Sequence, residues 1–246
     1  MDNSKLISNL IDTRSEKLWL QIDLLFNVTI EQTRDGNYGC FTQGNEAIIY
    51  IDFHKLCKDS FAHELLHAQM SMKGCYIGGS LRKFITESTV LSMLLKIELG
   101  DHIGNVLQHI RFYDLYLKLG FDKTKFITDY NTHKCTEAEL SSLEMLYRNL
   151  SYLCLDIHLG LLFAVLCDPN PELDYTSAKV RLSKLEPELY RISSNLVEQW
   201  KQTEIDNYRP VVTEFITSLE KWIKRKQRYN LWLHKLMFDI KYILNK

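Results

Sequence analysis

Residues 57–74 read CKDSFAHELLHAQMSMKG, and the rest of the predicted fold is arranged around this stretch. The stretch predicts a helix, because Asp59 or Ser60 can cap its N-terminus with a side-chain oxygen. Gly74 predicts the end of the helix, since glycine readily adopts the left-handed conformation that commonly terminates one. The middle of this predicted helix contains the pattern H-E-x-x-H.

The pattern consists of His63, Glu64 and His67. Helical positions i and i+4 lie on one face, one turn apart, so both imidazoles can reach a single metal ion. Glu64 can then stand beside the open position of the metal and take a proton from water. The alternative interpretation is a core helix with two hydrogen-bonded histidines, because a short motif can arise by chance.

A catalytic zinc site needs a third protein ligand and keeps one position for water. We predict Glu87 as that ligand, from the segment 81–98, which reads LRKFITESTVLSMLLKIE and has helical periodicity. Glu87 falls on the apolar stripe of this helix, where a carboxylate is costly unless it is paired, protonated or bound to a metal. The alternatives are an ion pair of Glu87 with Arg82 or Lys83, and Glu98 as the third ligand.

These residues carry a resemblance to a known class of enzyme. His63, Glu64, His67 and Glu87 resemble the site of zincin metallopeptidases of the gluzincin type, in which a glutamate from the next helix completes the zinc site. The spacing from His67 to Glu87 is similar to that of thermolysin-like members. The strand-rich stretch before the motif is similar to the compact ImmA/IrrE-like metallopeptidases.

The resemblance covers about residues 38–100 and has one clear departure. Thermolysin-like enzymes place an aspartate four residues after the ligand glutamate, where it orients a ligand histidine, but this chain has Leu91 there. A ligand histidine must therefore find a different hydrogen-bond partner. In zincins the strand beside the cleft pairs with an extended substrate, and the resemblance implies that residues 47–53 form that strand.

The segment before the motif predicts a helix over residues 4–26 and then a small antiparallel sheet. Residues 27–33 are β-branched and alternate in polarity, as expected of a strand. The stretches YGCFTQ and EAIIYIDF predict two further strands, joined by the turn pair Gly44-Asn45. The predicted sheet ends just before the helix that carries the motif.

Residues 101–120 predict another helix, which begins after a stop at Gly100. Histidine, asparagine and tyrosine side chains fall along one side of it, at His102, Asn105, His109, Tyr113 and Tyr116. Gluzincins commonly use a histidine or tyrosine to hydrogen-bond the oxyanion formed during hydrolysis. The resemblance therefore implies His109 as the oxyanion-stabilising residue, with Tyr113 as a second candidate. A solvated face of an amphipathic helix explains the same pattern.

Charge and cysteine usage narrow the class of protein. The 30 basic and 31 acidic residues give a net charge of -1, which does not favour general attraction to nucleic acid or membranes. The six cysteines have no metal-binding or secreted spacing, so reduced thiols are expected. The N-terminus lacks the apolar core of a signal peptide. The longest apolar run, at 159–166, is too short to span a bilayer. We therefore expect a cytoplasmic protein without a nucleic-acid or membrane partner.

From about residue 135 the pattern is helical throughout. Thr136 and Glu139 can form a capping box at the start of this region. The stretch DPNPELD at 168–174 is the clearest break. Further helices are expected at about 176–206, 208–226 and 228–245. The predicted class is α+β and mainly helical, with a zincin-like metallopeptidase core at 1–128 and a helical region at 129–246.

The predicted function is a zinc-dependent metallopeptidase that hydrolyses a peptide bond in a specific intracellular protein. His63, His67 and Glu87 would bind Zn²⁺, while Glu64 would activate water and pass its proton to the leaving amine. The alternative is a non-catalytic metal-binding module, regulatory or toxin-like, that acts through protein–protein interaction. The intact Glu64 favours the enzyme, because a structural metal site has no use for a base.

Overall fold

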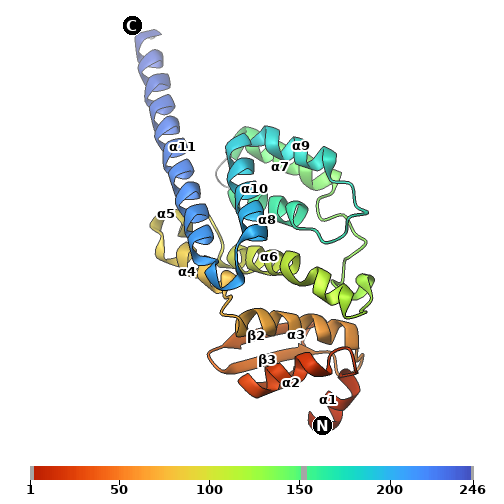
Figure 1. The fold of residues 1–246 in the computed structure, drawn as a ribbon. Coiled ribbons are helices and arrows are strands. Elements are labelled where there is room, and N and C mark those ends of the chain that lie inside the picture. Colours follow the sequence, from red (N-terminus) through yellow and green to blue (C-terminus); the bar gives the residue numbers. More distant parts are fainter. Residues whose placement is uncertain (1–2, 151–153, 245–246) are drawn as a thin grey trace.

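The computed structural model describes residues 3–150 and 154–244 and confirms a mainly helical α+β fold (Figure 1). Within these residues the strands are β1 (Asn27–Gln32), β2 (Gly39–Gln43) and β3 (Glu46–Ile51). The helices up to the middle of the chain are α1 (Asn3–Leu10), α2 (Glu16–Leu25), α3 (Lys58–Met72), α4 (Ile77–Glu87), α5 (Thr89–Ser92) and α6 (Ile97–Lys118). The later helices are α7 (Glu137–Leu150), α8 (Leu155–Leu166), α9 (Thr176–Leu185), α10 (Pro187–Gln202) and α11 (Arg209–Leu244). Two 3₁₀ turns, η1 (Lys123–Lys125) and η2 (Ile205–Asn207), complete the order.

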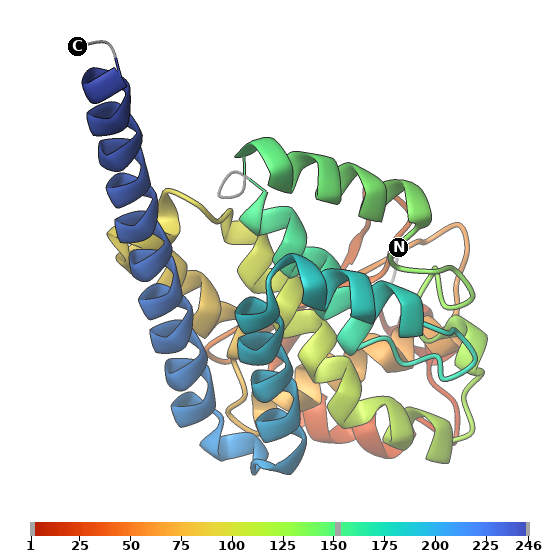
Figure 2. The same cartoon turned by 90° about the horizontal axis from the view of Figure 1, so that it is seen from above.

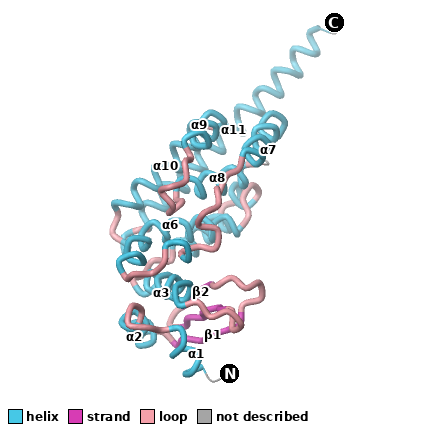
Figure 3. The backbone as a smooth tube through the Cα atoms, turned by 90° about the vertical axis from the view of Figure 1, so that its right-hand side faces the viewer, coloured by secondary structure: helices cyan, strands magenta, loops and turns pink. Residues whose placement is uncertain are grey.

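The molecule is arranged in layers from the sheet to the C-terminal helices. The strands and α1 to α3 lie at one end, α6 crosses the middle, and α7 to α10 cover the other side of α6 (Figures 1 and 3). α11 runs alongside this body and extends beyond it (Figure 2). None of the helices in the described ranges is long and apolar enough to cross a membrane.

The sheet is mixed, which corrects the prediction of a purely antiparallel one. β3 lies in the middle, with β2 antiparallel on one side and β1 parallel on the other. Gly44, with φ of +60°, makes the tight turn between β2 and β3. Ala47, Ile49 and Ile51 alternate along β3 and are fully buried, so β3 gains most from a position with neighbours on both sides.

The central position of β3 also corrects the prediction that residues 47–53 receive a substrate strand. Both edges of β3 already pair with β1 and β2, so no further strand can be added there. β2 pairs only with β3 among the described strands, which leaves its other edge open. Among the described strands, β1 and β2 are therefore the two edge strands, and β2 is the one that packs against α3, the helix that carries the motif.

The predicted helix over residues 4–26 is in fact two helices, α1 and α2. Asp12 interrupts it, because its carboxylate accepts a hydrogen bond from the Arg14 backbone N–H at 2.9 Å and its carbonyl accepts one from Ser15 N–H at 3.0 Å. Such local bonds compete with helical ones and favour a turn. α2 then packs against α3.

The predicted motif helix is confirmed as α3, with one difference at its start. Its N-cap is Cys57, whose Sγ accepts a hydrogen bond from Ser60 N–H at 3.5 Å, rather than Asp59 or Ser60. Gly74 has φ of +77° and ends the helical turn as predicted. α3 packs between the sheet and α6, so one of its faces is turned toward α6.

The predicted helix over 81–98 is broken into α4, α5 and the start of α6. α4 ends at Glu87, because Ser88 is extended and caps α5 through a hydrogen bond to Leu91 N–H. Gly100 lies inside α6 instead of stopping a helix. It allows close packing against α4, since a Cβ at Gly100 would lie 2.9 Å from the Arg82 backbone nitrogen.

The C-terminal region packs onto α6 and α4 rather than standing apart. α8 and α10 contact α6, and α11 contacts α4 and α10. Buried side chains on both sides of position 128 belong to one hydrophobic cluster. The capping box is confirmed, with Thr136 N–H 2.7 Å from Glu139 Oε2 and Glu139 N–H 3.2 Å from Thr136 Oγ1.

The other boundaries in this region are partly as predicted. The stretch 168–174 separates α8 from α9, as expected. The predicted 176–206 helix divides at Pro187, which starts α10, because proline suits the first turn of a helix and not its interior. The predicted helices 208–226 and 228–245 form one helix, α11. Residues 151–153, inside the long pattern between 136 and 166, lie outside the described residues.

Candidate metal centre

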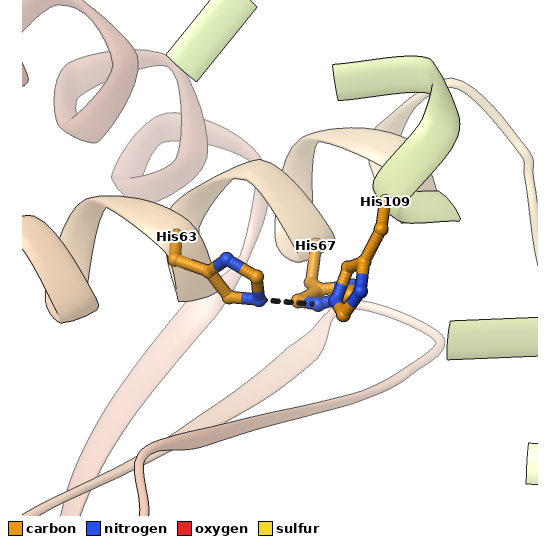
Figure 4. Close-up of side chains that lie close together, drawn as sticks. All are labelled: His63, His67 and His109. Carbon is orange, nitrogen blue, oxygen red and sulfur yellow. Dashed lines mark hydrogen bonds between the residues drawn. The ribbon is translucent and has the colours of Figure 1, made fainter. Parts of the chain in front are cut away.

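Three histidines from two helices converge at the contact between α3 and α6 (Figure 4). His63 and His67 come from α3, and His109 comes from α6. The Nε2 atoms of His63 and His67 are 3.0 Å apart, and one ligand atom from each of the three rings lies within 4.8 Å of the others. A tetrahedral zinc with Zn–N bonds of about 2.0–2.1 Å would place two ligand nitrogens about 3.3 Å apart. The three rings are therefore close enough to hold one metal ion. We call them the histidine cluster.

Burial keeps the histidine cluster neutral. Only 6 % of His63 and 5 % of His109 is exposed. Burial, and then the neighbouring imidazoles, hold the pKa of His63 and that of His109 well below the usual value of 6.5. Burial lowers the pKa of His67 to about 4. Neutral imidazole is the form that binds a metal, so the cluster is ready for binding at neutral pH.

The hydrogen bonds of the histidine cluster are incomplete. His109 Nε2 and His63 Nδ1 are buried and have no hydrogen-bond partner among the described residues. A buried polar atom without a partner costs about 1–3 kcal/mol. A bond to a metal ion would satisfy the ring nitrogen of His109, so the residues present fit such an ion. Three histidines with one open position are a ligand set of catalytic zinc sites.

Glu64 lies beside the histidine cluster without belonging to it. Its Oε1 is 4.0 Å from His63 Nε2, and only 6 % of the residue is exposed. Burial raises the pKa of Glu64 to about 8. A cation bound nearby favours the charged form of a carboxylate, so a bound metal would lower this pKa again. Glu64 is therefore placed to exchange a proton next to the metal position.

The histidine cluster and Glu64 line a cleft with a volume of about 1030 Å³. Its walls come from the β2 edge with the loop before it (36–42), from α3, the start of α4, the middle of α6 and the segment 124–129. The cleft therefore offers access to the metal position from solvent. The thiols of Cys40 and Cys57 also line it, and none of the six cysteines forms a disulfide.

Aromatic packing holds the rings of the histidine cluster from one side. The Phe126 ring lies 4.6 Å from the His63 ring and 5.2 Å from the His109 ring, measured between centroids. The chain after Phe126 is fixed at Tyr130, whose carbonyl accepts a hydrogen bond from Asn170 at 2.9 Å. The hydroxyls of Tyr130 and Tyr113 bond to each other. Tyr113, the second candidate for oxyanion stabilisation, therefore has its hydroxyl engaged in holding this wall.

Glu87 does not fit the predicted role of third ligand. The structure places it at the end of α4, where 64 % of its side chain is exposed and Oε1 lies 3.8 Å from Lys83 Nζ. The ion pair with Lys83 is the alternative that the sequence left open. The prediction assumed that the helix continues past Glu87, but α4 ends there, so the expected apolar stripe does not form. Glu98, the reserve ligand, is exposed in the first turn of α6.

His109 lies with the other two histidines instead of standing apart as an oxyanion donor. The sequence placed it on the correct face of a helix, and His102 and Asn105 line the cleft from the same helix. The sequence did not indicate that His109 lies beside His63 and His67, because α4 and α5 separate it from His67 along the chain. The sequence feature that could have pointed to His109 is a histidine on a polar helix face with no nearby residue in the sequence to pair with it.

No protein family, curated protein or solved structure matches this chain. What the structure adds to the sequence motif is a buried group of three histidines that could hold a metal ion. The group that could hold a metal differs from the ligand set that the resemblance to gluzincins implied, because its third member is His109 and not Glu87.

Proposed function

We propose that this protein is a zinc-dependent metallopeptidase in which His63, His67 and His109 hold the ion. The observation that carries the proposal is the convergence of three neutral imidazoles, within 4.8 Å of one another, beside a buried glutamate in an open cleft. A purely structural zinc site fills all four positions with protein ligands, whereas a catalytic site leaves one open.

Glu64 is the general base of the proposed reaction. Zinc, when bound, polarises a carbonyl and lowers the pKa of water to about 7. Glu64 takes the proton from the attacking water and delivers it to the leaving amine. Burial raises the pKa of Glu64 in the metal-free protein, and a bound cation would lower it again. The ionised carboxylate would then accept the proton of the water and, once protonated, give it to the amine.

The open edge of β2 supports a polypeptide substrate. Residues 39–42 of this strand line the same cleft as the histidine cluster, and their free edge offers backbone N–H and C=O groups. An extended peptide can pair with such an edge as an additional strand. We propose that a segment of a specific intracellular protein binds there, with the scissile bond placed between Glu64 and the histidine cluster.

The test begins with the metal and then turns to cleavage. Zinc bound per chain is measured for the purified wild type and for His63→Ala. Cleaved peptides are then compared between cells that express the wild type and cells that express Glu64→Gln. The matched control is Glu87→Gln, which makes the same chemical change on the exposed end of α4.

The outcomes separate the candidate functions. Cleavage products in cells with the wild type or Glu87→Gln, but not Glu64→Gln, support the metallopeptidase. Zinc bound to the wild type without any cleavage supports a non-catalytic metal-binding module. Zinc bound to neither the wild type nor His63→Ala contradicts both and makes the motif a coincidence.

A further inference from the structure

Gln108 makes the one hydrogen bond that the described residues give to the histidine cluster from outside it. Its Oε1 lies 2.6 Å from His67 Nδ1. His63 Nδ1 is buried and has no such partner. Within the described residues, His67 is therefore the ring of the cluster that hydrogen-bonds to a side chain outside it.

The direction of this hydrogen bond follows from the geometry of His67. Its Nε2 is 3.0 Å from His63 Nε2 and faces the interior of the cluster, so this nitrogen is the one available to a metal. A metal ligand nitrogen carries no proton, so the proton of neutral His67 is on Nδ1. Nδ1–H then donates to Gln108 Oε1, since an amide oxygen can only accept.

Gln108 and His109 are neighbours on α6, and both lie next to His67. The His109 ring centroid is 5.3 Å from that of His67, and Gln108 Oε1 lies 2.6 Å from Nδ1 of the same ring. One turn of α6 thus supplies a ligand and the partner of another ligand. The packing of α6 against α3 therefore places His109 and Gln108 relative to His67 at the same time.

We propose that Gln108 is the positioning residue of the metal centre, holding His67 in the tautomer and orientation that present Nε2 to the ion. This inference rests on the metal site proposed above. Gln108 supplies this acceptor from α6, a different helix from the α3 that carries His67. Because its amide is neutral, it orients the ring without adding negative charge, and more positive charge stays on the metal ion.

The first experiment measures zinc affinity by competition with a chromophoric chelator. Gln108→Leu keeps the size of the side chain but cannot accept a hydrogen bond, and we expect a 10–100-fold weaker affinity, the usual effect of losing such a partner. Gln108→Glu restores the acceptor, and we expect wild-type or tighter affinity because its charge attracts the cation. Asn105→Leu is the matched control, since Asn105 lines the same cleft from the same helix but makes no hydrogen bond to the cluster. We expect wild-type affinity for it.

Equal zinc affinity of the wild type and Gln108→Leu would overturn the role of Gln108 while leaving the metal site intact. So would a Gln108→Glu variant that binds zinc as weakly as Gln108→Leu. A wild type that binds no zinc contradicts the proposed function itself, so the two failures are distinguishable.

The second experiment needs no variant and no metal. The nitrogen-15 shifts of the histidine rings in the metal-free wild type, recorded at pH 7.5, report which ring nitrogen carries the proton. We expect a protonated Nδ1 and a bare Nε2 for His67. A protonated Nε2 would overturn the proposal even if Gln108→Leu fails to fold.

Discussion

Among the residues whose burial the structure describes, histidine is buried in two places, and only one of them forms a candidate site. His158 on α8 is fully buried, and its Nδ1 lies 2.6 Å from the Tyr147 hydroxyl. Burial lowers the pKa of His158 to about 4, as it does for His67. Within the described residues, however, His158 belongs to no group of three metal-ligating side chains that could share an ion. It acts as a hydrogen-bonded part of the core.

The comparison shows that burial of a histidine is a different property from the convergence of several ligand atoms. A depressed pKa only indicates that a histidine is neutral and away from water. A metal site also requires several ligand atoms directed at one point and an opening to solvent. The histidine cluster meets both conditions, because α3 and α6 cross at the wall of a cleft.

The largest effect is expected from removing a ligand. His109→Ala should lose zinc binding and, with it, all zinc-dependent cleavage. His158→Ala should keep both and lose about 1–3 kcal/mol of stability, since Tyr147 loses its buried partner. Elemental analysis, cleavage assays and chemical denaturation of the two variants measure these effects. Full zinc binding by His109→Ala would place the third ligand elsewhere.

The next effect concerns the base and not the ligands. Glu64→Gln should reduce cleavage by about 10²–10⁴-fold, the usual contribution of general acid–base catalysis, while zinc binding is retained. The substitution keeps the size of the side chain, so the thermal transition should also remain. Zinc content and turnover are measured on the same sample. Zinc loss in this variant would mean that Glu64 is itself a ligand.

The sequence predicted the parts of this site that one helix brings together. His63, Glu64 and His67 are linked by helical spacing, which is a local property. The third position depends on where α6 crosses α3, and no local pattern encodes that crossing. Glu87 was predicted instead, because a break at Ser88 is hard to detect within an apolar, periodic segment.

The sheet illustrates the same limit. The strands and the turn at Gly44 followed from composition, but their order did not. The sequence predicted an antiparallel sheet without a strand order, whereas β3 lies between β1 and β2 and pairs in parallel with β1. β3 pairs along both of its edges, which leaves β1 and β2 as the edge strands of the described sheet, and β2 borders the cleft.

A third prediction uses pH to compare the two histidine environments. The cluster and His158 have pKa values below the unfolded value of 6.5. Below pH 6.5 the unfolded chain therefore takes up protons that the folded chain does not, and stability present above pH 6.5 is lost as the pH falls. Each such proton contributes roughly 1.4 kcal/mol per pH unit. Denaturation of the metal-free protein at pH 7 and pH 5 should show this loss. In His158→Ala the loss of unfolding free energy should be smaller by the contribution of one histidine. An unchanged free energy of unfolding would contradict the burial of the cluster.

Glu64 should give the opposite dependence on pH. Its pKa is raised from 4.5 to about 8 by burial, so the folded protein keeps a proton that the unfolded chain releases. Its contribution is full below pH 4.5 and is lost as the pH rises toward 8. Between pH 6.5 and 8 the metal-free wild type should therefore lose stability, whereas Glu64→Gln should not. Parallel curves for the two proteins would mean that Glu64 is ionised when folded.

The smallest effect is expected at Glu87. Glu87→Ala should leave zinc affinity unchanged, because the side chain is exposed and paired with Lys83 on the surface. Its effect on stability should stay within about 0.5 kcal/mol, as for most exposed ion pairs. Chelator competition and chemical denaturation measure both. A sharp loss of zinc affinity would restore Glu87 to the ligand set.

The central claim is that three histidines from two helices hold one zinc ion. X-ray absorption at the zinc edge, recorded on the wild type loaded with one equivalent of zinc, tests it most directly, because it counts imidazole ligands and detects sulfur. We predict three imidazole nitrogens, one further light-atom ligand and no sulfur. A sulfur contribution from Cys40 or Cys57, fewer than three imidazoles, or no tightly bound zinc would contradict the account.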